Sequence, residues 1–591
     1  MAEKEKKTNK KSNGRGWVIL IAVIIVLSAI GHIAYQQFMM LYERAKDTKH
    51  SAEAAVEYLM NKDFEKSQEK VNEVRESIKY FRGIAENEYV YKFGCWLPKY
   101  GEDFESACLL LDIADETLDT WSDRAFDLLK TYPLDAVITE DGANVRTALA
   151  YLNFAEEAVP AAEELFKRIL PIRLSFYDMR GLTNKIREKA DDYLDLYHEV
   201  EYYFPLIHAI LGDGSDKLFL IAAQNTAEIR PCGGFPGAMG TVSVKDGILS
   251  IGEFDSVWTV MPYNTPSYLM PDSSVNNLFG GLMVWPRDAE FNPDFEFLGK
   301  FWSDVYEYKY GVPLDGVISV TPAIIQDALE IFGSIEVSNG DVLDGTNAVK
   351  VLQYDWYVDY MNTYAISYST DNQNDIVDAL FKDTVEQTVK LATSNLDIEK
   401  VPLLINLLEE SADERVFMLW LRDEAAEETV RSYGFSGGLG GTEEEPEIGI
   451  FYGNDYGCKL GWWIDADVYM SEGRDLSDGS REYDVSVTFT NNFNARDTYY
   501  MGYYIVGTRR TAVLSWYIYA FAPKGGDVYD MYIDYWNPMR ETTYKGLQVG
   551  YVHQHYISPG TSSTLRFKVK TAPGITARPV IKQTPTLTKY R

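Results

Sequence analysis

The sequence predicts a multidomain α+β protein with four parts in chain order. These are a single N-terminal transmembrane helix, a helical stalk or bundle, an α/β core domain and a C-terminal antiparallel β-sandwich. Three observations predict this arrangement: one long apolar stretch near the N-terminus, helical periodicity up to about residue 215, and a strand-rich remainder that ends in short strands alone. Since 591 residues exceed what one hydrophobic core supports, we expect separate domains.

The apolar stretch covers residues 17–35, and Ser28 and His32 are its only polar residues. A helix of 19 residues spans ~28 Å at ~1.5 Å per residue, close to the ~30 Å hydrocarbon core of a bilayer. Trp17 and Tyr35 stand at its two ends, where interfacial aromatic residues belong. We therefore expect a single transmembrane helix.

The basic tail, residues 1–16, carries six Lys or Arg residues against two Glu residues. Because basic flanks stay on the cytoplasmic side, we expect this tail to be cytoplasmic and residues 41–591 to be extracytoplasmic. A cleaved signal peptide is the alternative. Residues 36–40 lack the small-x-small cleavage site that a signal peptide requires, which favours an uncleaved anchor in the cell membrane.

The net charge of −33 argues against nucleic acid as a partner, because a phosphate backbone needs a basic surface. The four cysteines are too few for a disulfide scaffold, and no pair has the spacing of a metal site. Cys95 and Cys108 either form a disulfide or stay free; the sequence leaves this open.

Residues 40–215 carry apolar residues at spacings of three and four, which predicts a helical stalk or bundle. Its later predicted helices cover residues 144–158, 161–169 and 182–204. Pro160 and Pro171 mark predicted bends. The charged helix faces are typical of solvated surfaces, so this part indicates no chemistry.

The α/β core, residues 216–436, opens with a strand, a loop and a hairpin. Residues 218–223 form a short apolar run, typical of a strand buried on both faces. Residues 238–244 and 248–254 flank a Lys-Asp-Gly sequence, and an Asp-Gly turn between apolar runs predicts a β-hairpin.

The later predicted elements of the core alternate between helices and strands, which favours an α/β domain. The helices cover residues 297–308, 322–332, 345–352, 375–392 and 423–433, and the strands cover residues 313–320 and 333–337. A Gly- and Glu-rich linker follows at residues 437–447. The predicted sandwich, residues 448–591, has strands at 462–470, 483–491, 499–507, 514–522, 546–552 and 562–569, and an edge strand in the tail 571–591.

The loop after the first core strand is the predicted functional site. It contains Asn225, Glu228, Arg230, Gly233 and Gly234. A carboxylate, a guanidinium and several glycines between buried strands favour binding or catalysis. The alternative is structural: the Glu228–Arg230 pair fixes the loop, and the glycines serve turns alone.

Two other motifs are weaker candidates. Residues 434–438 match G-x-S-x-G, but a predicted helix precedes them and no helix follows, which argues against a nucleophile elbow. His553 and His555 stand at strand spacing, where two histidines can bind a metal. No carboxylate or cysteine lies near them in sequence, which favours surface histidines.

The loop and hairpin resemble the signature of a bacterial cell-envelope family known as domain of unknown function 4012. The matching residues of the pattern Gln-Asn-x-x-Glu-x-Arg-x-x-Gly-Gly-Phe are Gln224, Asn225, Glu228, Arg230, Gly233, Gly234 and Phe235. Residues 292–295, 314–318 and 434–438 are similar to later segments of that family, so the resemblance covers about residues 40–590.

Residues 315–320, 334–337 and 343–348 resemble a second family, the LytR-CpsA-Psr enzymes. These extracytoplasmic phosphotransferases attach glycopolymers from polyprenyl-pyrophosphate carriers to peptidoglycan, and they have an α/β/α core and one membrane span. Their arginines and carboxylates grip the pyrophosphate, often with a divalent cation such as Mg²⁺. Pyrophosphate needs bidentate donors, and a metal offsets the developing charge.

This second resemblance implies roles for individual residues. It places Arg230 where the family has an early arginine and Asp255 where the family has an Arg-Asp pair. Together with the composition of the loop, this predicts Arg230, Glu228 and Asp255 as catalytic residues and Gln224, Asn225, Gly233 and Gly234 as ligand-binding residues. The chain also departs from the family: Phe254 stands where the family has an arginine, and residues 371–375 contain no arginine where the family has a cluster. A single arginine is a poor grip on a pyrophosphate.

Two functions follow as hypotheses. In the first, the protein acts in the assembly or attachment of surface glycopolymers, and its LytR-CpsA-Psr-like core binds a polyprenyl-pyrophosphate-linked glycan, as a phosphotransferase if it is catalytic. In the second, it is a non-catalytic envelope scaffold that binds wall polymer or another protein. The expected partners are the membrane, a lipid-linked glycan, peptidoglycan or envelope proteins.

Overall fold

The computed structural model describes residues 14–98, 100–133, 138–139, 142–174, 194–212, 214–362, 371–395, 400–507, 509–534 and 539–591. The chain is a mixed α/β protein with two compact units. The first unit consists of Met1–Leu134 and Asn153–Leu194, and the second of Asp135–Leu152 and Asp195–Arg591.

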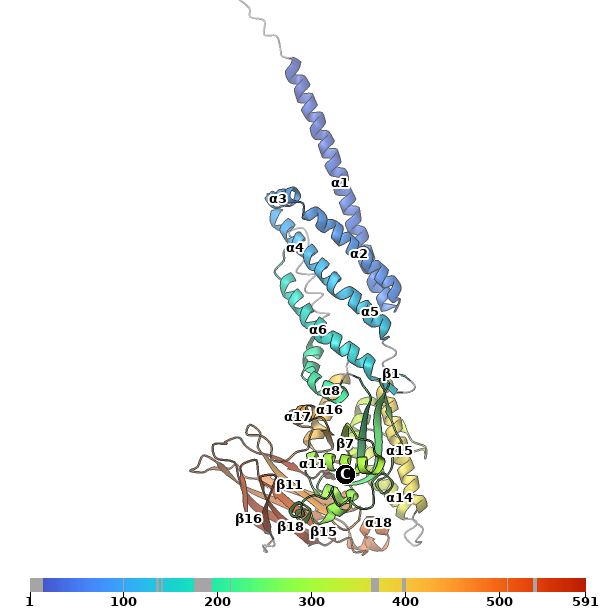
Figure 1. Cartoon of the computed structure of the whole chain (residues 1–591), viewed down its shortest axis with the longest axis vertical. Helices are drawn as coiled ribbons and strands as arrows, with labels where there is room; N and C mark the ends of the chain where they lie inside the picture. The colour runs from blue at the N-terminus through green and yellow to red at the C-terminus, as the bar shows by residue number, and fades with distance from the viewer. Residues whose placement is uncertain are drawn as a thin grey trace, which may run out of the picture. The chain divides into compact units, whose positions relative to one another are not determined.

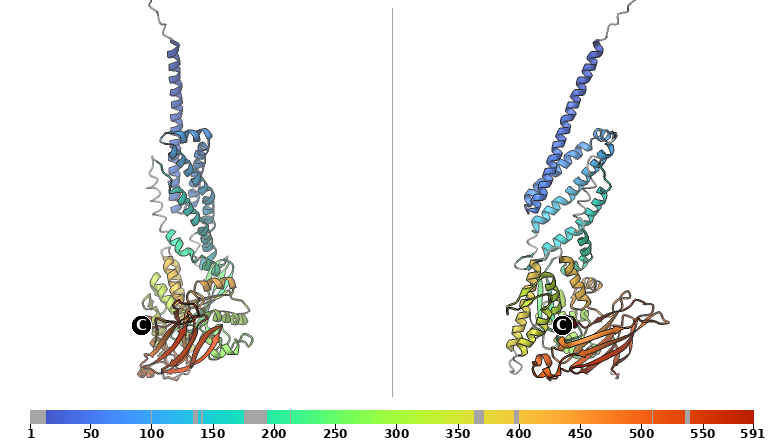
Figure 2. Two further views of the ribbon diagram at one scale, coloured as in Figure 1. Left: turned by 90° about the vertical axis from the view of Figure 1, so that its left-hand side faces the viewer. Right: turned by 180° about the vertical axis from the view of Figure 1, so that it is seen from behind.

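The first unit is helical, as Figures 1 and 2 show. Its helices are α1 (Gly14–Met60), α2 (Phe64–Ala85), α3 (Glu88–Trp96), α4 (Gly101–Thr117), the π-helical turn η1 (Leu118–Ser122), α5 (Asp123–Thr131) and the later part of α6 (Val145–Ile169). Helix α2 packs against both α1 and α4. Arg75 of α2 donates to the carbonyl oxygen of Leu118 at 2.9 Å and pairs with Asp123 at 3.0 Å, which ties α2 to the start of α5.

The predicted membrane segment, residues 17–35, lies within α1, and most of its side chains are outside the described residues. Over the part of the chain that is described, no helix combines the length and the apolar character needed to cross a bilayer. The predicted helix at residues 182–204 also lies largely outside the described residues.

The second unit contains a mixed sheet in the order β1-β2-β5-β4-β3-β7-β10, with β6 beside β4. Its strands are β1 (Ile138–Thr139), β2 (Gly142–Asn144), β3 (Lys217–Asn225), β4 (Phe235–Lys245), β5 (Ile248–Ile251), β6 (Asp255–Ser256), β7 (Gly316–Val320) and β10 (Phe417–Leu421). Strands β3 and β7 are parallel, and the other neighbours are antiparallel. The predicted hairpin is confirmed: Asp246 and Gly247 take φ values of 52° and 84°, which a two-residue hairpin turn requires.

Helices cover both faces of this sheet. They include α8 (Phe204–Leu211), α9 (Val257–Val260), α10 (Ser273–Leu278), α11 (Phe295–Tyr310), α12 (Pro322–Phe332), α13 (Ala348–Lys350), α14 (Trp356–Asn362), α15 (Asp371–Ser394), α16 (Val401–Asp413) and α17 (Glu424–Ser432). Leu220 of β3 packs in one core cluster with Trp302 of α11. Phe219, on the opposite face, packs with Leu206 of α8 and Val430 of α17. Burial on both faces explains why β3 appears in the sequence as a continuous apolar run.

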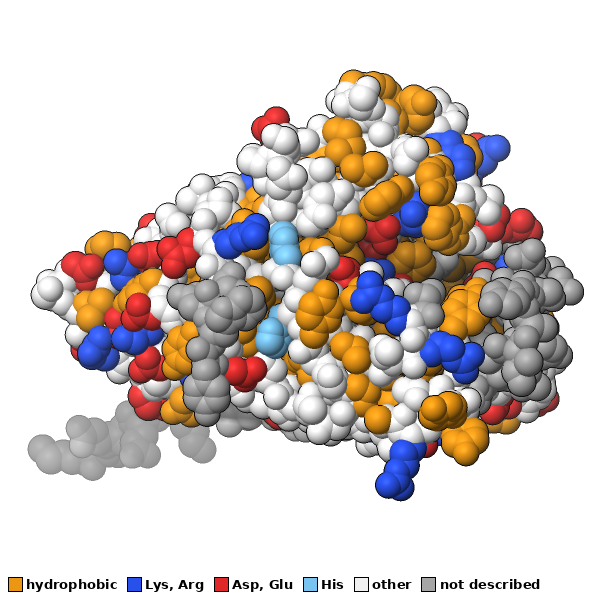
Figure 3. All heavy atoms as spheres, turned by 90° about the horizontal axis from the view of Figure 1, so that it is seen from below, with side chains coloured by type: hydrophobic (Ala, Val, Ile, Leu, Met, Phe, Trp, Pro, Cys, Tyr) orange, Lys and Arg blue, Asp and Glu red, His pale blue; other side chains and the backbone are white. Residues whose placement is uncertain are grey.

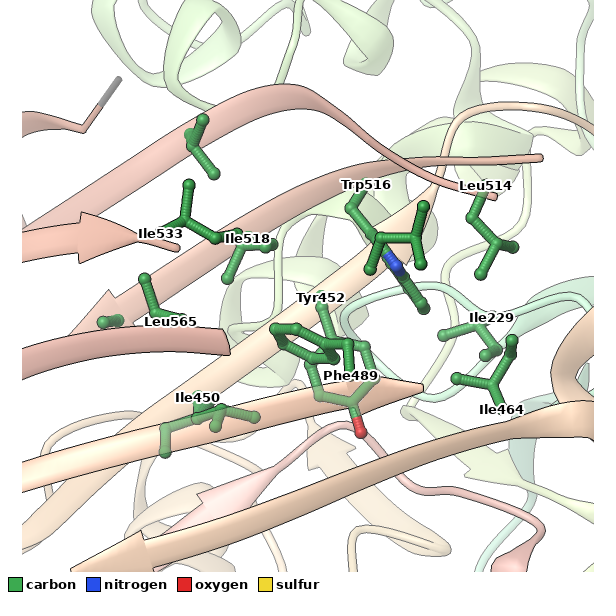
Figure 4. Packing of buried hydrophobic residues seen from close by; sticks show 14 of the residues in the cluster. Ile229, Ile450, Tyr452, Ile464, Phe489, Leu514, Trp516, Ile518, Ile533 and Leu565 are labelled. Carbon is green, nitrogen blue, oxygen red and sulfur yellow. The ribbon is translucent and has the colours of Figure 1, made fainter. Parts of the chain in front are cut away.

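The C-terminal part is a two-sheet sandwich with the orders β17-β18-β15-β11-β20 and β12-β14-β19-β16, and β13 beside β14. Its strands are β11 (Glu447–Asn454), β12 (Ile464–Met470), β13 (Arg474–Asp475), β14 (Arg481–Asn491), β15 (Leu514–Phe521), β16 (Asp527–Ile533), β17 (Arg540–Tyr544), β18 (Leu547–Ile557), β19 (Thr561–Lys570) and β20 (Val580–Gln583). Tyr452, Phe489 and Trp516 fill the space between the sheets (Figure 4). All neighbouring strands are antiparallel except β11 and β20.

Three predicted elements are wrong. Residues 499–507 are not a strand but contain helix α18 (Tyr503–Val506), because Ile505 and Val506 reach the sandwich core from a helical turn. The two helices predicted around Pro160 are one helix, α6, with the proline inside it. Asn144, predicted as the first residue of a helix, is instead the last residue of β2, which pairs with β5. Local sequence patterns do not contain these long-range contacts.

Candidate functional site

The side chain of Asn225 fixes the start of the loop between β3 and β4. Its Oδ1 accepts a hydrogen bond from the Ala227 N–H at 3.0 Å, and its Nδ2 donates to Tyr357 Oη at 2.7 Å. The same Ala227 N–H donates to Gln353 Oε1 at 2.9 Å. Asn225 therefore ties the loop to the segment 351–362, which is more than a hundred residues away in the sequence.

The two glycines allow the loop to fold back on the end of β3. Gly233 has a φ of 136°, and a Cβ at this position would collide with Oε1 of Gln224. A Cβ on Gly234 would collide with the backbone of Asn225. Gly233 needs glycine because of its positive φ, and Gly234 needs glycine because the two backbone segments approach closely there.

The tip of the loop joins the core sheet to the sandwich. Ile229 is buried in the sandwich core, and Figure 4 shows it beside Ile464. Its carbonyl oxygen accepts from the Asn454 N–H at 3.1 Å, and the Ala227 carbonyl accepts from the Gly461 N–H at 2.8 Å. The residue between the two predicted catalytic side chains is thus a packing residue.

Arg230 is buried among three carboxylates. Its Nη2 lies 3.1 Å from Glu228 Oε1 and 3.8 Å from Asp288 Oδ1, and its Nε lies 3.7 Å from Glu290 Oε1. Its Nη1 also donates to the carbonyl oxygen of Asn454. The guanidinium group is therefore surrounded by protein groups, although its Nε forms no hydrogen bond in the described residues.

Burial and charge shift the pKa values of this cluster in consistent directions. Burial alone would lower the pKa of Arg230, but the neighbouring carboxylates raise it above its usual value. Burial raises the pKa of Glu290 well above its ordinary range, since its carboxyl group is fully buried and accepts no hydrogen bond in the described structure. Lys459, at 3.4 Å from Glu228, adds a second buried cation. The Arg230 cluster (Glu228, Arg230, Asp288, Glu290 and Lys459) is an internal ion network in which burial raises the pKa of Glu290.

Asp255 lies elsewhere on the sheet, in β6 beside Met239 of β4. Its side chain is exposed, and its Oδ1 accepts from the Ser256 N–H at 2.7 Å. In the described residues, no hydrogen bond or ion pair links Asp255 to Glu228 or Arg230. The structure brings two of the three predicted catalytic residues together and leaves Asp255 apart from them.

A pocket of about 310 Å³ lies at the end of β3, between the sheet and helices α12 and α15. This volume is at the lower end of the range for small-molecule sites, ~300–1,000 Å³. Its walls are mainly apolar and include Ile221, Phe254, Val320, Ile325, Phe332, Phe381 and Val385. Lys382 and Asp378 are its charged lining residues. Such walls suit a hydrocarbon chain rather than a pyrophosphate.

Neutral polar residues also line the pocket, and several have buried atoms without a partner. Within the described residues, both amide atoms of Gln224, Nε2 of Gln353 and Oγ1 of Thr388 are buried and form no hydrogen bond. A buried polar group without a partner costs ~1–3 kcal/mol, so such groups are retained where a ligand satisfies them or where they serve another role. Asn225 and Tyr357 line the same pocket but bond to each other.

The predicted ligand-binding residues thus divide into two groups. Gln224 and Asn225 line the pocket, whereas Gly233 and Gly234 support the loop behind them. Sequence reasoning missed Gln353 and Thr388, which lie in later helical segments. The apolar residues of α12 and α15 predicted helices but not a pocket, because the same periodicity occurs in helices that face a pocket and in helices that face a core.

The other candidates have local partners. Ser436 Oγ donates to Glu296 Oε1 at 2.9 Å, and no described helix follows it, so a nucleophile elbow is absent there. His553 Nε2 lies 2.8 Å from the Leu278 carbonyl oxygen, and His555 Nε2 lies 2.8 Å from Ser563 Oγ. Among the residues that the structure describes, no group of three His, Cys, Asp or Glu side chains is arranged to hold a metal ion. The four cysteines are free thiols.

The surface in Figure 3 mixes charges and apolar side chains. Lys and Arg side chains lie in separate spots among acidic, hydrophobic and uncharged groups. On the described part of this face, no continuous basic stripe follows the surface, whereas a nucleic-acid backbone requires one.

Residues 214–357 match the family model DUF4012, which is described as a protein of unknown function. This segment contains the loop, the central strands β3, β4 and β7, and part of the pocket wall. No curated protein and no solved structure matches the chain. The comparisons give no support to the resemblance to the LytR-CpsA-Psr enzymes, which stays a prediction.

Proposed function

We propose that this chain, which belongs through residues 214–357 to the DUF4012 family, is a membrane-anchored envelope protein that binds the hydrocarbon chain of a lipid-linked glycan or a related amphiphile. Such a protein acts in the assembly or attachment of surface glycopolymers. Its N-terminal segment, residues 17–35, is the anchor, the tail 1–16 is cytoplasmic, and residues 41–591 are extracytoplasmic.

The observation that carries this proposal is the pocket. Its apolar walls offer a hydrocarbon chain a dry environment, and burial contributes ~0.8 kcal/mol per CH₂ group. A volume of about 310 Å³ equals roughly ten water molecules at ~30 Å³ each, so it holds the part of a chain nearest the head group rather than a whole polyprenyl tail. The unpaired amides and hydroxyl then meet the polar group that follows the chain.

The few basic residues around the pocket favour a protein that binds the ligand without transferring a phosphoryl group. Lys382 is the single basic residue among those described around the pocket, and no arginine lines it. Arg230 is occupied by Glu228, Asp288 and a backbone carbonyl group. A pyrophosphate needs several forked donors, and this pocket supplies few. A non-catalytic envelope protein is accordingly preferred to a phosphotransferase.

Photo-crosslinking tests the proposal. The full-length protein in lipid nanodiscs is exposed to photoreactive geranylgeranyl phosphate and, separately, to a photoreactive fatty acid, and the labelled peptides are identified by mass spectrometry. We expect labelling of α12 and α15 by at least one probe. Preference for one probe distinguishes an isoprenoid from an acyl ligand.

A matched pair of variants controls this experiment. Ala328→Phe fills the pocket from α12, whereas Ala426→Phe enlarges an equally half-buried alanine of α17 outside the pocket. We expect the first variant to lose the label and the second to keep it. Labelling confined to residues 17–35, or equal labelling of both variants, would contradict a chain-binding pocket.

A further inference from the structure

A row of four side chains crosses the outer face of the second sandwich sheet. In the register of the strands, Tyr469 of β12 stands opposite Ser486 of β14, Ser486 stands opposite Arg566 of β19, and Arg566 stands opposite Tyr532 of β16. Directly opposite residues place their side chains on the same face of a sheet. The row therefore begins and ends with a tyrosine and has polar residues at its centre.

This face is open, although the alternate residues of the same strands are buried in the sandwich core. Tyr469 is 65% exposed and Tyr532 is 41% exposed, whereas Val485 of β14 and Phe567 of β19 are 2% exposed. The row lies in a hollow of about 670 Å³. A hollow of this size accepts a ligand of several rings.

The lining supplies donors, acceptors and a balanced charge. Besides the row, Asp484, Asp530 and Lys568 line the hollow, so two carboxylates meet two basic groups. Lys568 Nζ lies 3.4 Å from Asp530 Oδ2. In the described structure the side chains of the four row residues form no hydrogen bond or ion pair, so their polar groups remain available to a ligand.

We propose that this face binds a neutral oligosaccharide segment that lies across the strands. One face of a pyranose ring carries C–H groups, which pack on an aromatic ring, and its hydroxyl groups bond to serine, carboxylate and guanidinium groups. Strands are ~4.8 Å apart, so two tyrosines three strands apart are separated by ~14 Å, the reach of a short oligosaccharide.

The side chains of this face favour a neutral oligosaccharide over a charged polymer or a protein partner. A strongly anionic or cationic polymer gains little from a lining with balanced charges. A protein partner is expected to place an apolar core at the centre of its interface, and the centre of this row is Ser486 and Arg566. The proposal concerns the sandwich alone and does not depend on the pocket in the core domain.

Affinity electrophoresis tests the proposal with the full-length protein. Native gels are cast with mannan, dextran, galactan or a soluble β-glucan, and the detergent is a polyoxyethylene ether, because a sugar-headed detergent would compete. We expect at least one polysaccharide to retard the protein, and added salt to leave the retardation unchanged. Heparin serves as the anionic comparison.

Variants locate the binding face. Tyr469→Ala and Tyr532→Ala each weaken binding about tenfold, and the double variant abolishes it, because each removes a stacking surface. Tyr469→Trp keeps or strengthens binding if the aromatic ring stacks on the sugar. If Tyr469 were only structural, the larger ring would not favour binding. Tyr500→Ala, at a tyrosine 77% exposed outside the hollow, leaves binding unchanged.

Three results would overturn the proposal. These are no retardation by any neutral polysaccharide, retardation by heparin alone with strong salt dependence, and retardation that the double variant retains. Circular dichroism of the double variant verifies that its fold is intact, and Tyr469→Trp provides a second measurement if that variant fails to fold.

Discussion

The Arg230 cluster and the pocket both lie near the end of β3, but their polar groups differ. The cluster pairs charged groups with each other, whereas the pocket has buried neutral polar atoms without a partner among the residues that the structure describes. In the cluster, Arg230 contacts Glu228, Asp288 and the Asn454 carbonyl group, although its Nε and the Glu290 carboxyl oxygens form no hydrogen bond in the described structure. The pocket has two charged lining residues, Lys382 and Asp378, but the amide atoms of Gln224 and Oγ1 of Thr388 are neutral, buried and without a hydrogen-bond partner in the described residues.

This difference separates support from binding. Arg230 is buried, links the core sheet to the sandwich through the Asn454 carbonyl group, and is already engaged by carboxylates of the protein. A buried neutral group with no partner destabilises the free protein and gains its partner only when a ligand arrives. The residues that looked most chemical in the sequence are therefore structural in their contacts, and the less conspicuous amides line the pocket.

Removal of Arg230 should have the largest effect. Arg230→Ala leaves buried carboxylates without their cation, and we expect a loss of about 3–5 kcal/mol in the free energy of unfolding, measured by chemical denaturation. Arg496→Ala, at an exposed arginine, is the control and should change stability by less than about 0.5 kcal/mol. A stable Arg230→Ala protein with lost ligand binding would instead assign Arg230 to the ligand site.

The pH dependence of the free energy of unfolding tests the raised pKa of Glu290. Because the pKa of Glu290 is raised in the folded protein, the native state keeps a proton that the unfolded chain releases above about pH 4.5. Stability should therefore fall as pH rises from the unfolded pKa to the folded pKa, by up to about 1.4 kcal/mol per pH unit for one proton. Glu290→Gln carries no such proton and should flatten this slope. Equal slopes for both proteins would place the proton elsewhere.

Replacement of the unpaired Gln224 should raise the stability of the ligand-free protein, whereas replacement of the hydrogen-bonded Gln326 should lower it. Gln224→Leu removes two unpaired amide atoms and should stabilise the ligand-free protein by about 1–3 kcal/mol while weakening capture of the lipid probe. Gln326→Leu is the matched control, since Gln326 is also buried but accepts the Val349 N–H at 2.8 Å. The control should lose stability. Loss of stability in both variants would mean that Gln224 is structural.

A smaller effect is expected at two threonines one turn apart on α15. Thr384 Oγ1 donates to the Leu380 carbonyl oxygen at 2.8 Å, whereas Thr388 Oγ1 has no partner and lines the pocket. Thr384→Val should lose about 1 kcal/mol of stability, and Thr388→Val should gain a similar amount or remain unchanged. Thermal denaturation of both variants measures the difference. The comparison fails if the two changes have the same sign.

Much of the fold could be predicted from the sequence because local patterns decide it. The apolar run at 218–223, the Asp-Gly turn and the proline that starts α12 each indicate an element that the structure contains. Strands β16 and β17 were not predicted, and residues 499–507 were predicted as a strand, because their conformation depends on neighbours from other parts of the sandwich.

The candidate site was predictable only in part. The loop was found because Gln224, Asn225, Glu228 and Arg230 form a dense polar segment after an apolar strand. The pocket was not, since its wall combines β3 and β4 with α12 and α15, and no local pattern brings these segments together. Asp255 was grouped with Arg230 by family resemblance, and the structure gives it a separate, exposed position.

The sequence by itself determined the elements with strong local signals and the signature at residues 224–235, which lies within the family match at residues 214–357. These depend on side-chain periodicity and turn chemistry, which act over a few residues. The tertiary structure alone decided which polar groups are paired and which are not. Arg230 meets Asn454 and Asp288, and Gln224 lies at a pocket with Thr388, because the fold brings segments together that are far apart in the sequence.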